Sequence, residues 1–266
     1  MNDENINNQP VINQNAEQNE TEELSKLDAI TGIFTEPGET FETISRNKTR
    51  NYWLIPVLIM VVAGIVSSFL FFRDAELVDK IMDKQKQKLR ERMEENVKSG
   101  KMSKEQSNEA IERAEKFMDP KSVIFQITGY SGAVFSPFFI LFLLSLIYVI
   151  ALKIMKAPFV YTNLLNIIGL SMVINAIGGI VSIVLSIVMG DFVSLGLSLV
   201  IKESAVGINL HTLLTKLDVF SIWFYVLISI GLSRISGIKQ GTSYGVVFGI
   251  WIVYLIVTSF VFNSMF

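Results

Sequence analysis

Residue types that could do chemistry are scarce in this sequence. There is one histidine, His211, and no cysteine, which excludes cysteine nucleophiles, disulfides, cysteine metal sites and a histidine pair for a metal. A Ser-His-Asp triad would require the tertiary fold to bring His211 next to Asp218 and a serine, and no sequence motif indicates that it does. The segment 241–245, Gly-Thr-Ser-Tyr-Gly, lacks the lysine of a phosphate-binding loop and follows no predicted strand. The sequence therefore predicts no catalytic residue, no cofactor and no metal, and we expect that the protein is not an enzyme.

Ionisable side chains are missing from the interior of every long apolar segment. Proton-coupled carriers, voltage sensors and intramembrane proteases need such groups within the bilayer, so these classes are disfavoured. Asn175 is the one strongly polar residue near the middle of its segment, and it is predicted to make an interhelical hydrogen bond or to line a polar passage. Two alternative functions stay open. The first is a passive or partner-driven transport component for a small or amphipathic solute, with Asn166, Asn175 and Tyr130 along its path. The second, ranked lowest, is a lipid-acting enzyme whose polar groups lie in the connection 190–216.

The overall composition agrees with a chain that is mostly embedded in lipid. Of the 266 residues 50% are hydrophobic and 18% are charged, and the mean hydropathy is +0.45, which is typical of a polytopic membrane protein with a water-exposed part. A net charge of −2 gives no support for nucleic acid as a partner. The polar N-terminal residues are not followed by an apolar core of signal-peptide type, so the first spanning helix is expected to act as the insertion signal.

Uncharged apolar runs predict an all-α fold, a polytopic membrane bundle. A run of twenty residues at about 1.5 Å per residue covers roughly 30 Å, which matches one hydrocarbon core. A spanning run must satisfy its backbone hydrogen bonds internally, which favours a helix. Five spanning helices are predicted, at residues 53–72, 123–152, 164–189, 219–233 and 244–262. The connection 190–216 is too short and too broken for two further crossings and is predicted to be interfacial or partly re-entrant.

Three regions are predicted to lie outside the spans. Residues 1–23 carry few apolar side chains and are expected to form a disordered tail before a membrane domain over residues 24–266. Residues 24–44 have apolar side chains at helical spacing and are predicted to be two amphipathic helices at the membrane surface. Residues 73–121 are dense in charges of both signs and are predicted to be an extramembrane helical hairpin, either a water-exposed insert or a partner-binding coiled coil.

Small residues form stripes on two of the predicted spans. Such stripes let helix backbones approach closely in lipid, where burial of apolar area no longer favours one contact over another. The predicted packing residues are Ser171, Asn175, Gly178, Ser182 and Ser186 on the third span and Gly241, Gly245 and Gly249 on the fifth. The third span is thus the candidate for the central helix. Whether the glycines of the fifth span pack within the chain or against a second copy stays open.

Basic residues flank one side of the predicted bundle. They are Arg46, Lys48 and Arg50 before the first span, Lys153 and Lys156 after the second, and Arg234 and Lys239 after the fourth. The positive-inside rule then predicts a multi-pass protein of the cell membrane with its N-terminus in the cytoplasm and its C-terminus outside. The hairpin at residues 73–121 would face outward.

Two segments resemble a known family. Residues 33–44, which include Pro37 and Phe41, are followed by a basic stretch and Trp53-Leu54-Ile55-Pro56, and this opening resembles that of the Ypt-interacting-protein (Yip) domain in its prokaryotic branch. The closing segment with Asp218, Phe220, Trp223 and Gly231 is similar to the end of that domain, so the likeness covers about residues 29–262. The resemblance implies five spans and a cytoplasmic N-terminus. Eukaryotic relatives bind Rab-type GTPases, a role that does not carry over to this chain, and the long charged hairpin departs from the family pattern.

These observations predict a non-enzymatic membrane scaffold or membrane-organising interaction partner. Expected partners are membrane lipids, other membrane proteins or a second copy of the chain, and not nucleic acid.

Overall fold

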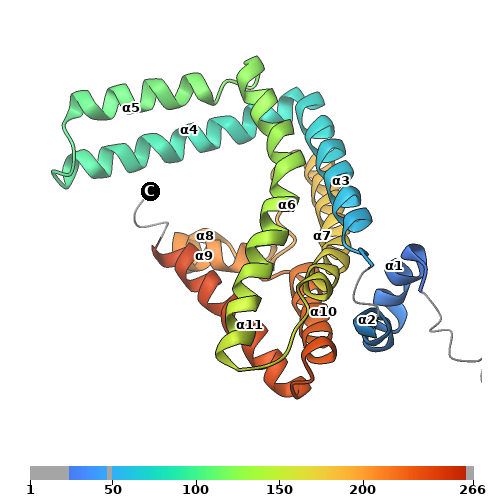
Figure 1. Ribbon diagram of the computed structural model, residues 1–266. Coiled ribbons are helices and arrows are strands. Elements are labelled where there is room, and N and C mark those ends of the chain that lie inside the picture. The colour runs from blue at the N-terminus through green and yellow to red at the C-terminus, as the bar shows by residue number, and fades with distance from the viewer. Residues whose placement is uncertain (1–23, 47–49, 262–266) are drawn as a thin grey trace, which may run out of the picture.

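A computed structural model describes residues 24–46 and 50–261 of the chain. The tail predicted at residues 1–23, Lys48 of the predicted basic cluster, and residues 262–266 lie outside the described part. The described residues form helices joined by short turns, as predicted (Figure 1). The helices are α1 (Lys26–Thr35), α2 (Pro37–Arg46), α3 (Leu54–Arg73), α4 (Ala75–Lys98), α5 (Lys104–Phe117), α6 (Val123–Ile154), α7 (Tyr161–Met189), a 3₁₀ turn (Leu197–Leu199), α8 (Glu203–Val206), α9 (Ile208–Thr215), α10 (Val219–Ser236), α11 (Gln240–Ile256) and a π turn (Val257–Val261).

Five of these helices are long and apolar enough to cross a membrane, which confirms the predicted bundle. They are α3, α6, α7, α10 and the helix over Gln240–Phe260. The last one begins four residues before the predicted residue 244, because Gly237 in a left-handed conformation (φ 68°) ends α10 and the chain turns directly into α11. Helix α6 runs without a break through Pro137 and has 32 residues, about 48 Å, so it is longer than one crossing requires.

Helix α7 is the centre of the bundle and contacts α1, α2, α3, α6 and α10. Glycines permit the two largest of these contacts. A Cβ added at Gly169 would lie 2.6 Å from the Trp53 side chain at the start of α3, and one at Gly178 would lie 2.9 Å from the Phe220 ring of α10. On α10, a Cβ at Gly231 would lie 2.5 Å from Ile167 of α7. Backbones therefore approach closely at the points where α7 meets its neighbours.

Two asparagines near the start of α7 hold the segment that enters α3. The Asn166 side chain is fully buried, and its Oδ1 accepts hydrogen bonds from the backbone N–H groups of Tyr52 (2.8 Å) and Trp53 (3.2 Å). Its Nδ2 donates to the Arg50 carbonyl at 2.9 Å, and Asn163 Nδ2 donates to the Ser45 carbonyl at 3.1 Å. These bonds satisfy backbone groups that would otherwise be costly to bury.

The α1–α2 pair uses its apolar face for protein contacts. Ile33, Phe41 and Ile44 are fully buried, and α2 packs mainly on α10. The Phe34 and Trp223 rings meet edge to face at 5.5 Å between centroids. The two amphipathic helices are present as predicted, and their buried apolar face packs on α10. Their predicted place at the membrane surface stays a prediction.

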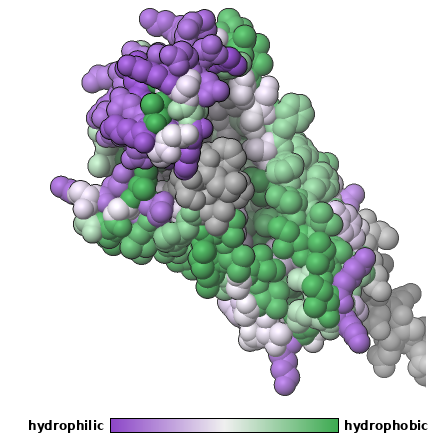
Figure 2. All heavy atoms as spheres, turned by 90° about the vertical axis from the view of Figure 1, so that its left-hand side faces the viewer, coloured by the Kyte–Doolittle hydropathy of each residue, from purple (hydrophilic) through white to green (hydrophobic). Residues whose placement is uncertain are grey.

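The α4–α5 hairpin projects from the end of the bundle that lies away from α1–α2 (Figure 1). Ser103 and Gln106 form the capping box that starts α5, as their spacing predicts. An ion pair between Arg90 and Glu115 joins the two helices. The buried residues of the hairpin are Leu77, Val78, Ile81 and Met82 in the first turns of α4 and Ser107 in α5, so most of the hairpin is a solvated arm. Figure 2 shows hydrophilic residues gathered over this region and hydrophobic residues over the bundle below it.

The glycine contacts generate a prediction on stability. Gly231→Leu should destabilise the bundle by about 1–3 kcal/mol, because the new side chain must displace Ile167 from a packed core. The matched change Gly245→Leu should leave the fold of one chain intact, since a Cβ there meets no other part of the chain within 4 Å. Thermal unfolding of both variants in detergent measures the difference. Equal melting temperatures would contradict the assignment of Gly231 as a close-contact position.

Candidate functional site: two cavities beneath the hairpin

Two adjoining cavities lie along the second half of α7. The larger cavity, about 550 Å³, is enclosed by α3, α4 and α7, with Phe125 of α6 and Phe192 beyond α7 at its edges. The smaller cavity, about 340 Å³, lies between α7, the start of α10 and the connection after α7. Asn175, Gly179, Ser182 and Phe192 line both. The cavities therefore meet on the α7 face that carries Asn175.

The larger cavity has apolar walls with a few uncharged polar groups. Ser67, Gln85 and Asn175 line it, and none of these three side chains has a hydrogen-bond partner among the residues that the structure describes. Its described lining includes no Asp, Glu, Lys, Arg or His. Such a chamber is suited to an apolar molecule that carries a hydrogen-bonding group.

The smaller cavity contains a carboxylate that already serves the fold. Asp218 Oδ1 accepts hydrogen bonds at 2.9 Å from the backbone N–H groups of Phe220 and Ser221, so the side chain caps α10. The Ser221 hydroxyl donates to the other carboxylate oxygen. The negative charge thus sits at a helix N-terminus, where the helix dipole stabilises it. The predicted family-motif residues Asp218 and Phe220 lie at this cavity. Pro37 begins α2, Phe41 is buried in α2, the Trp223 ring meets Phe34 of α1, and Gly231 lies against Ile167 of α7.

Serine hydroxyls fold the chain back along α7 after the helix ends. Gly190 takes a left-handed conformation (φ 59°) as the C-cap. The Val193 N–H then donates to Ser186 Oγ at 2.9 Å, and Ser182 Oγ donates to the Val193 carbonyl. Ser182 and Ser186 were predicted to pack against another helix, but they hold this turn instead. The N–H and C=O groups of Val193 lie outside a helix, so the serine hydroxyls can bond to them. A neighbouring helix bonds such backbone groups internally.

The other predicted packing residues divide into two groups. Gly178 lies against Phe220, and the buried Ser171 donates to the Ile167 carbonyl of its own helix. A Cβ added at Gly241, Gly245 or Gly249 would meet no described residue within 4 Å outside its own turn of the helix. Their stripe does not pack against the part of the chain that the structure describes, and contact with a second copy stays a prediction.

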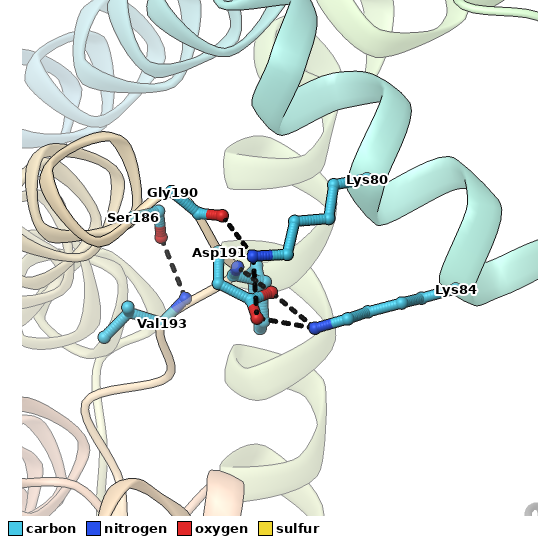
Figure 3. Close-up of polar contacts among 7 residues, drawn as sticks. Lys80, Lys84, Ser186, Gly190, Asp191 and Val193 are labelled. Atoms are coloured by element: carbon cyan, nitrogen blue, oxygen red, sulfur yellow. Dashed lines mark hydrogen bonds and ion pairs between the residues drawn. The ribbon is translucent and has the colours of Figure 1, made fainter.

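The root of the hairpin is fastened over the larger cavity by two lysines of α4 (Figure 3). Lys80 Nζ donates to the Gly190 carbonyl at 2.7 Å, and Lys84 Nζ donates to both carboxylate oxygens of Asp191 at 2.6 and 2.7 Å. One turn further along, Lys88 pairs with Glu203 at 3.3 Å.

The hydrogen bond from Lys84 lowers the pKa of the Asp191 carboxyl below its ordinary value. Leu77, Ile81, Met82 and Gln85 on the same turns form a wall of the cavity.

The connection from residue 190 to 217 contains the one histidine and a lysine in a partly buried setting. His211 Nδ1 lies 3.9 Å from Glu203, while Asp218 bonds to its own helix, so these two residues do not form a triad. Lys216 Nζ donates to Thr258 Oγ1 and lies 5.4 Å from the centroid of the Tyr254 ring. Burial lowers the pKa of Lys216. Within the described ranges no three metal-ligating side chains gather in one place.

The three residues predicted for a transport path do not lie together. Asn175 lines both cavities, whereas Asn166 is buried with its amide bonded to backbone near α3. The Tyr130 ring contacts the Phe72 ring at 5.5 Å between centroids. Sequence reasoning singled out Asn175 but missed Ser67 and Gln85, because nothing in the sequence indicates that α3, α4 and α7 face one another there.

The Lys84–Asp191 contact generates a prediction on the hairpin. Asp191→Asn should increase hydrogen exchange over residues 75–88 at neutral pH, because it removes the charge that holds the root. Glu109→Gln, which alters an ion pair within α5, is the matched control and should leave this segment unchanged. In the unaltered chain the pKa of the Asp191 carboxyl is lowered, so its ion pair with Lys84 is fully formed above the ordinary value of about 4 and is lost as pH falls through the lowered pKa. A spin label at position 86 that stays rigid in Asp191→Asn would contradict this role.

Comparison with known proteins identifies one family. The sequence profile of the Yip1 domain matches residues 31–261, which include all five apolar helices and the hairpin. No curated protein and no solved structure matches the chain.

Proposed function

We propose that this chain, which belongs to the Yip1 domain family, is a non-enzymatic membrane-organising protein that presents its α4–α5 hairpin to partners. The family and the five apolar helices identify a multi-pass membrane protein. The observation that carries the proposal is the anchored root of the hairpin: four residues in the first turns of α4 are buried and Lys80 and Lys84 bond to the residues after α7, while the rest of the arm stays solvated. Because the root of the charged arm is already ordered, a partner that binds the arm does not have to order the root, which would cost conformational entropy.

The proposed partners are other membrane proteins, a second copy of the chain and membrane lipids, with no role for nucleic acid. Charges of both signs along α4 and α5 support protein partners over a purely anionic surface. The exposed glycine stripe of α11 is a second place where a membrane helix has room to approach closely.

A photoreactive amino acid placed in the hairpin tests this proposal. At Glu109, an exposed position of α5, it should form crosslinks to proteins in the native membrane. At the control position Leu58, which lies on the exposed apolar face of α3, it should label lipid instead. Mass spectrometry of the adducts distinguishes the two. Protein adducts at Glu109 that do not exceed those at Leu58 would argue against the hairpin as an interaction surface.

The proposed orientation has the N-terminus in the cytoplasm and the hairpin and C-terminus outside. Support comes from the bundle itself, because α1–α2 pack near Asn163 at the start of α7 while the hairpin is fastened at Asp191 beyond its end. Arg46, Lys153 and Arg234 belong to the same end as α1–α2, in line with the positive-inside rule.

Single cysteines test the orientation, because the chain has none of its own. Ser99→Cys, in the turn of the hairpin, should react with a membrane-impermeant maleimide on intact cells. Lys26→Cys, at the start of α1, should react only after the membrane is opened. The reverse pattern of labelling would refute the proposed orientation.

A transport component for a small or amphipathic solute is the second candidate function. The position of Asn175 at the junction of two cavities favours it. Solute flux into reconstituted vesicles that is lost in Asn175→Leu would support this candidate over the scaffold.

A further inference from the structure

We infer that the larger cavity is a binding site for one hydrocarbon chain of an uncharged amphiphile, whose hydroxyl or ester group is held by Asn175. The inference goes beyond the proposed scaffold role and does not depend on it. It rests on the size of the cavity, the type of its lining, its lack of charge and the unbonded amide at its boundary.

The walls of the cavity suit a hydrocarbon chain. Its volume of about 550 Å³ lies within the range of roughly 300–1,000 Å³ that small-molecule sites occupy. Apolar side chains reach it from α3, α4, α6 and α7, and they include Met60, Phe71, Leu77, Ile81 and Ile183. Gly179 keeps one side of the space open, because a Cβ there would meet nothing within 4 Å.

Asn175 gives the site its polar contact. The carboxamide offers two donors and an acceptor, and no described residue bonds to it. It stands where the apolar cavity joins the smaller one, so a group held there has apolar walls on one side and polar residues on the other. The hydroxyl of the half-buried Ser67 and the amide of the exposed Gln85 border the same cavity. A ligand with a hydrogen-bonding head finds here donors and acceptors that no described residue occupies.

Charge decides the class of the amphiphile. None of the described residues that line the larger cavity is ionisable, and the Asp218 carboxylate of the smaller one is already occupied by the backbone N–H groups and hydroxyl at the start of α10. A phosphate or carboxylate placed at Asn175 would find no counter-charge in the described lining of the larger cavity, which is unfavourable in an apolar site. A cationic head would find no carboxylate in the larger cavity, and the Asp218 carboxylate of the smaller one already accepts three hydrogen bonds at the start of α10. An uncharged head such as that of a diacylglycerol meets neither penalty.

The mouth of the site is apolar. Phe192 lines both cavities and is 66% exposed, so a hydrophobic ring borders the opening. Val188 and Met189, in the preceding turn of α7, are also exposed. These exposed apolar residues offer a lipid chain an apolar surface at the edge of the cavity, beside the Lys84–Asp191 ion pair. The fastened root of α4 closes the cavity on the hairpin side.

Photolabelling of the full chain in phosphatidylcholine vesicles tests the inference. The probes are a photoreactive diacylglycerol and a photoreactive phosphatidic acid with the same chains. The diacylglycerol should give saturable adducts on residues 60–71 and 175–192, competed by unlabelled diacylglycerol, and the phosphatidic acid should label these segments at least tenfold less. Equal labelling by the two probes, or stronger labelling by phosphatidic acid that falls in Lys80→Ala, would overturn the assignment to an uncharged head. Non-saturable labelling by both would overturn the site itself.

Two variants separate the site from the fold. Gly179→Leu should fill the cavity and lower saturable labelling roughly tenfold, while Gly245→Leu, the same change on the exposed face of α11, should leave it unchanged. Asn175→Leu keeps the number and branching of the side-chain heavy atoms and removes their hydrogen-bonding capacity, so labelling should fall by about fivefold to tenfold. Thermal unfolding verifies that each variant is folded. Unchanged labelling in a folded Gly179→Leu chain would refute the inference.

Discussion

The bundle depends on how closely its helices can approach α7. In lipid, apolar area is not a reason for two helices to associate, so contacts must come from close packing and from satisfied polar groups. Gly169 and Gly178 permit close packing where Trp53 and Phe220 contact α7. Gly231 of α10 permits close packing against Ile167 of α7. Without these contacts α3 and α10 would lie further from the central helix, and the cavities between them would have different walls.

Polar side chains on α7 serve different ends of the protein according to their depth. Near its start, Asn163 and Asn166 bond to the backbone that enters α3. Near its end, Ser182 and Ser186 hold the turn that leads to the hairpin contact. Asn175 lies between the two groups. It lines both cavities and has no hydrogen-bond partner among the described residues.

The two ends of the bundle are held by different kinds of contact. On one side α1 and α2 bury an apolar face on α10, and the Asn163 bond to the Ser45 carbonyl and an exposed ion pair between Glu42 and Arg234 add to it. On the other side the hairpin buries four residues of α4 and is otherwise fastened by lysines to Gly190 and Asp191. Exposed ion pairs contribute little free energy, about 0–1 kcal/mol each, so the hairpin is held more weakly than α1–α2. Movement of the arm about its root is therefore easier than movement of the first two helices.

The sequence by itself determined the helices and their order. Apolar runs of membrane-spanning length, the charge density of residues 73–121 and the capping box at Ser103 are local properties, because each follows from neighbours along the chain. The tertiary structure alone decided what each helix face meets. Helical spacing places Ser171, Asn175, Gly178, Ser182 and Ser186 on one stripe, but the stripe meets a helix at Gly178, a turn at Ser182 and Ser186, and a cavity at Asn175. Periodicity reports which residues share a face, whereas the partner of that face depends on residues far away in the chain, and for this reason the candidate site became visible only in the folded bundle.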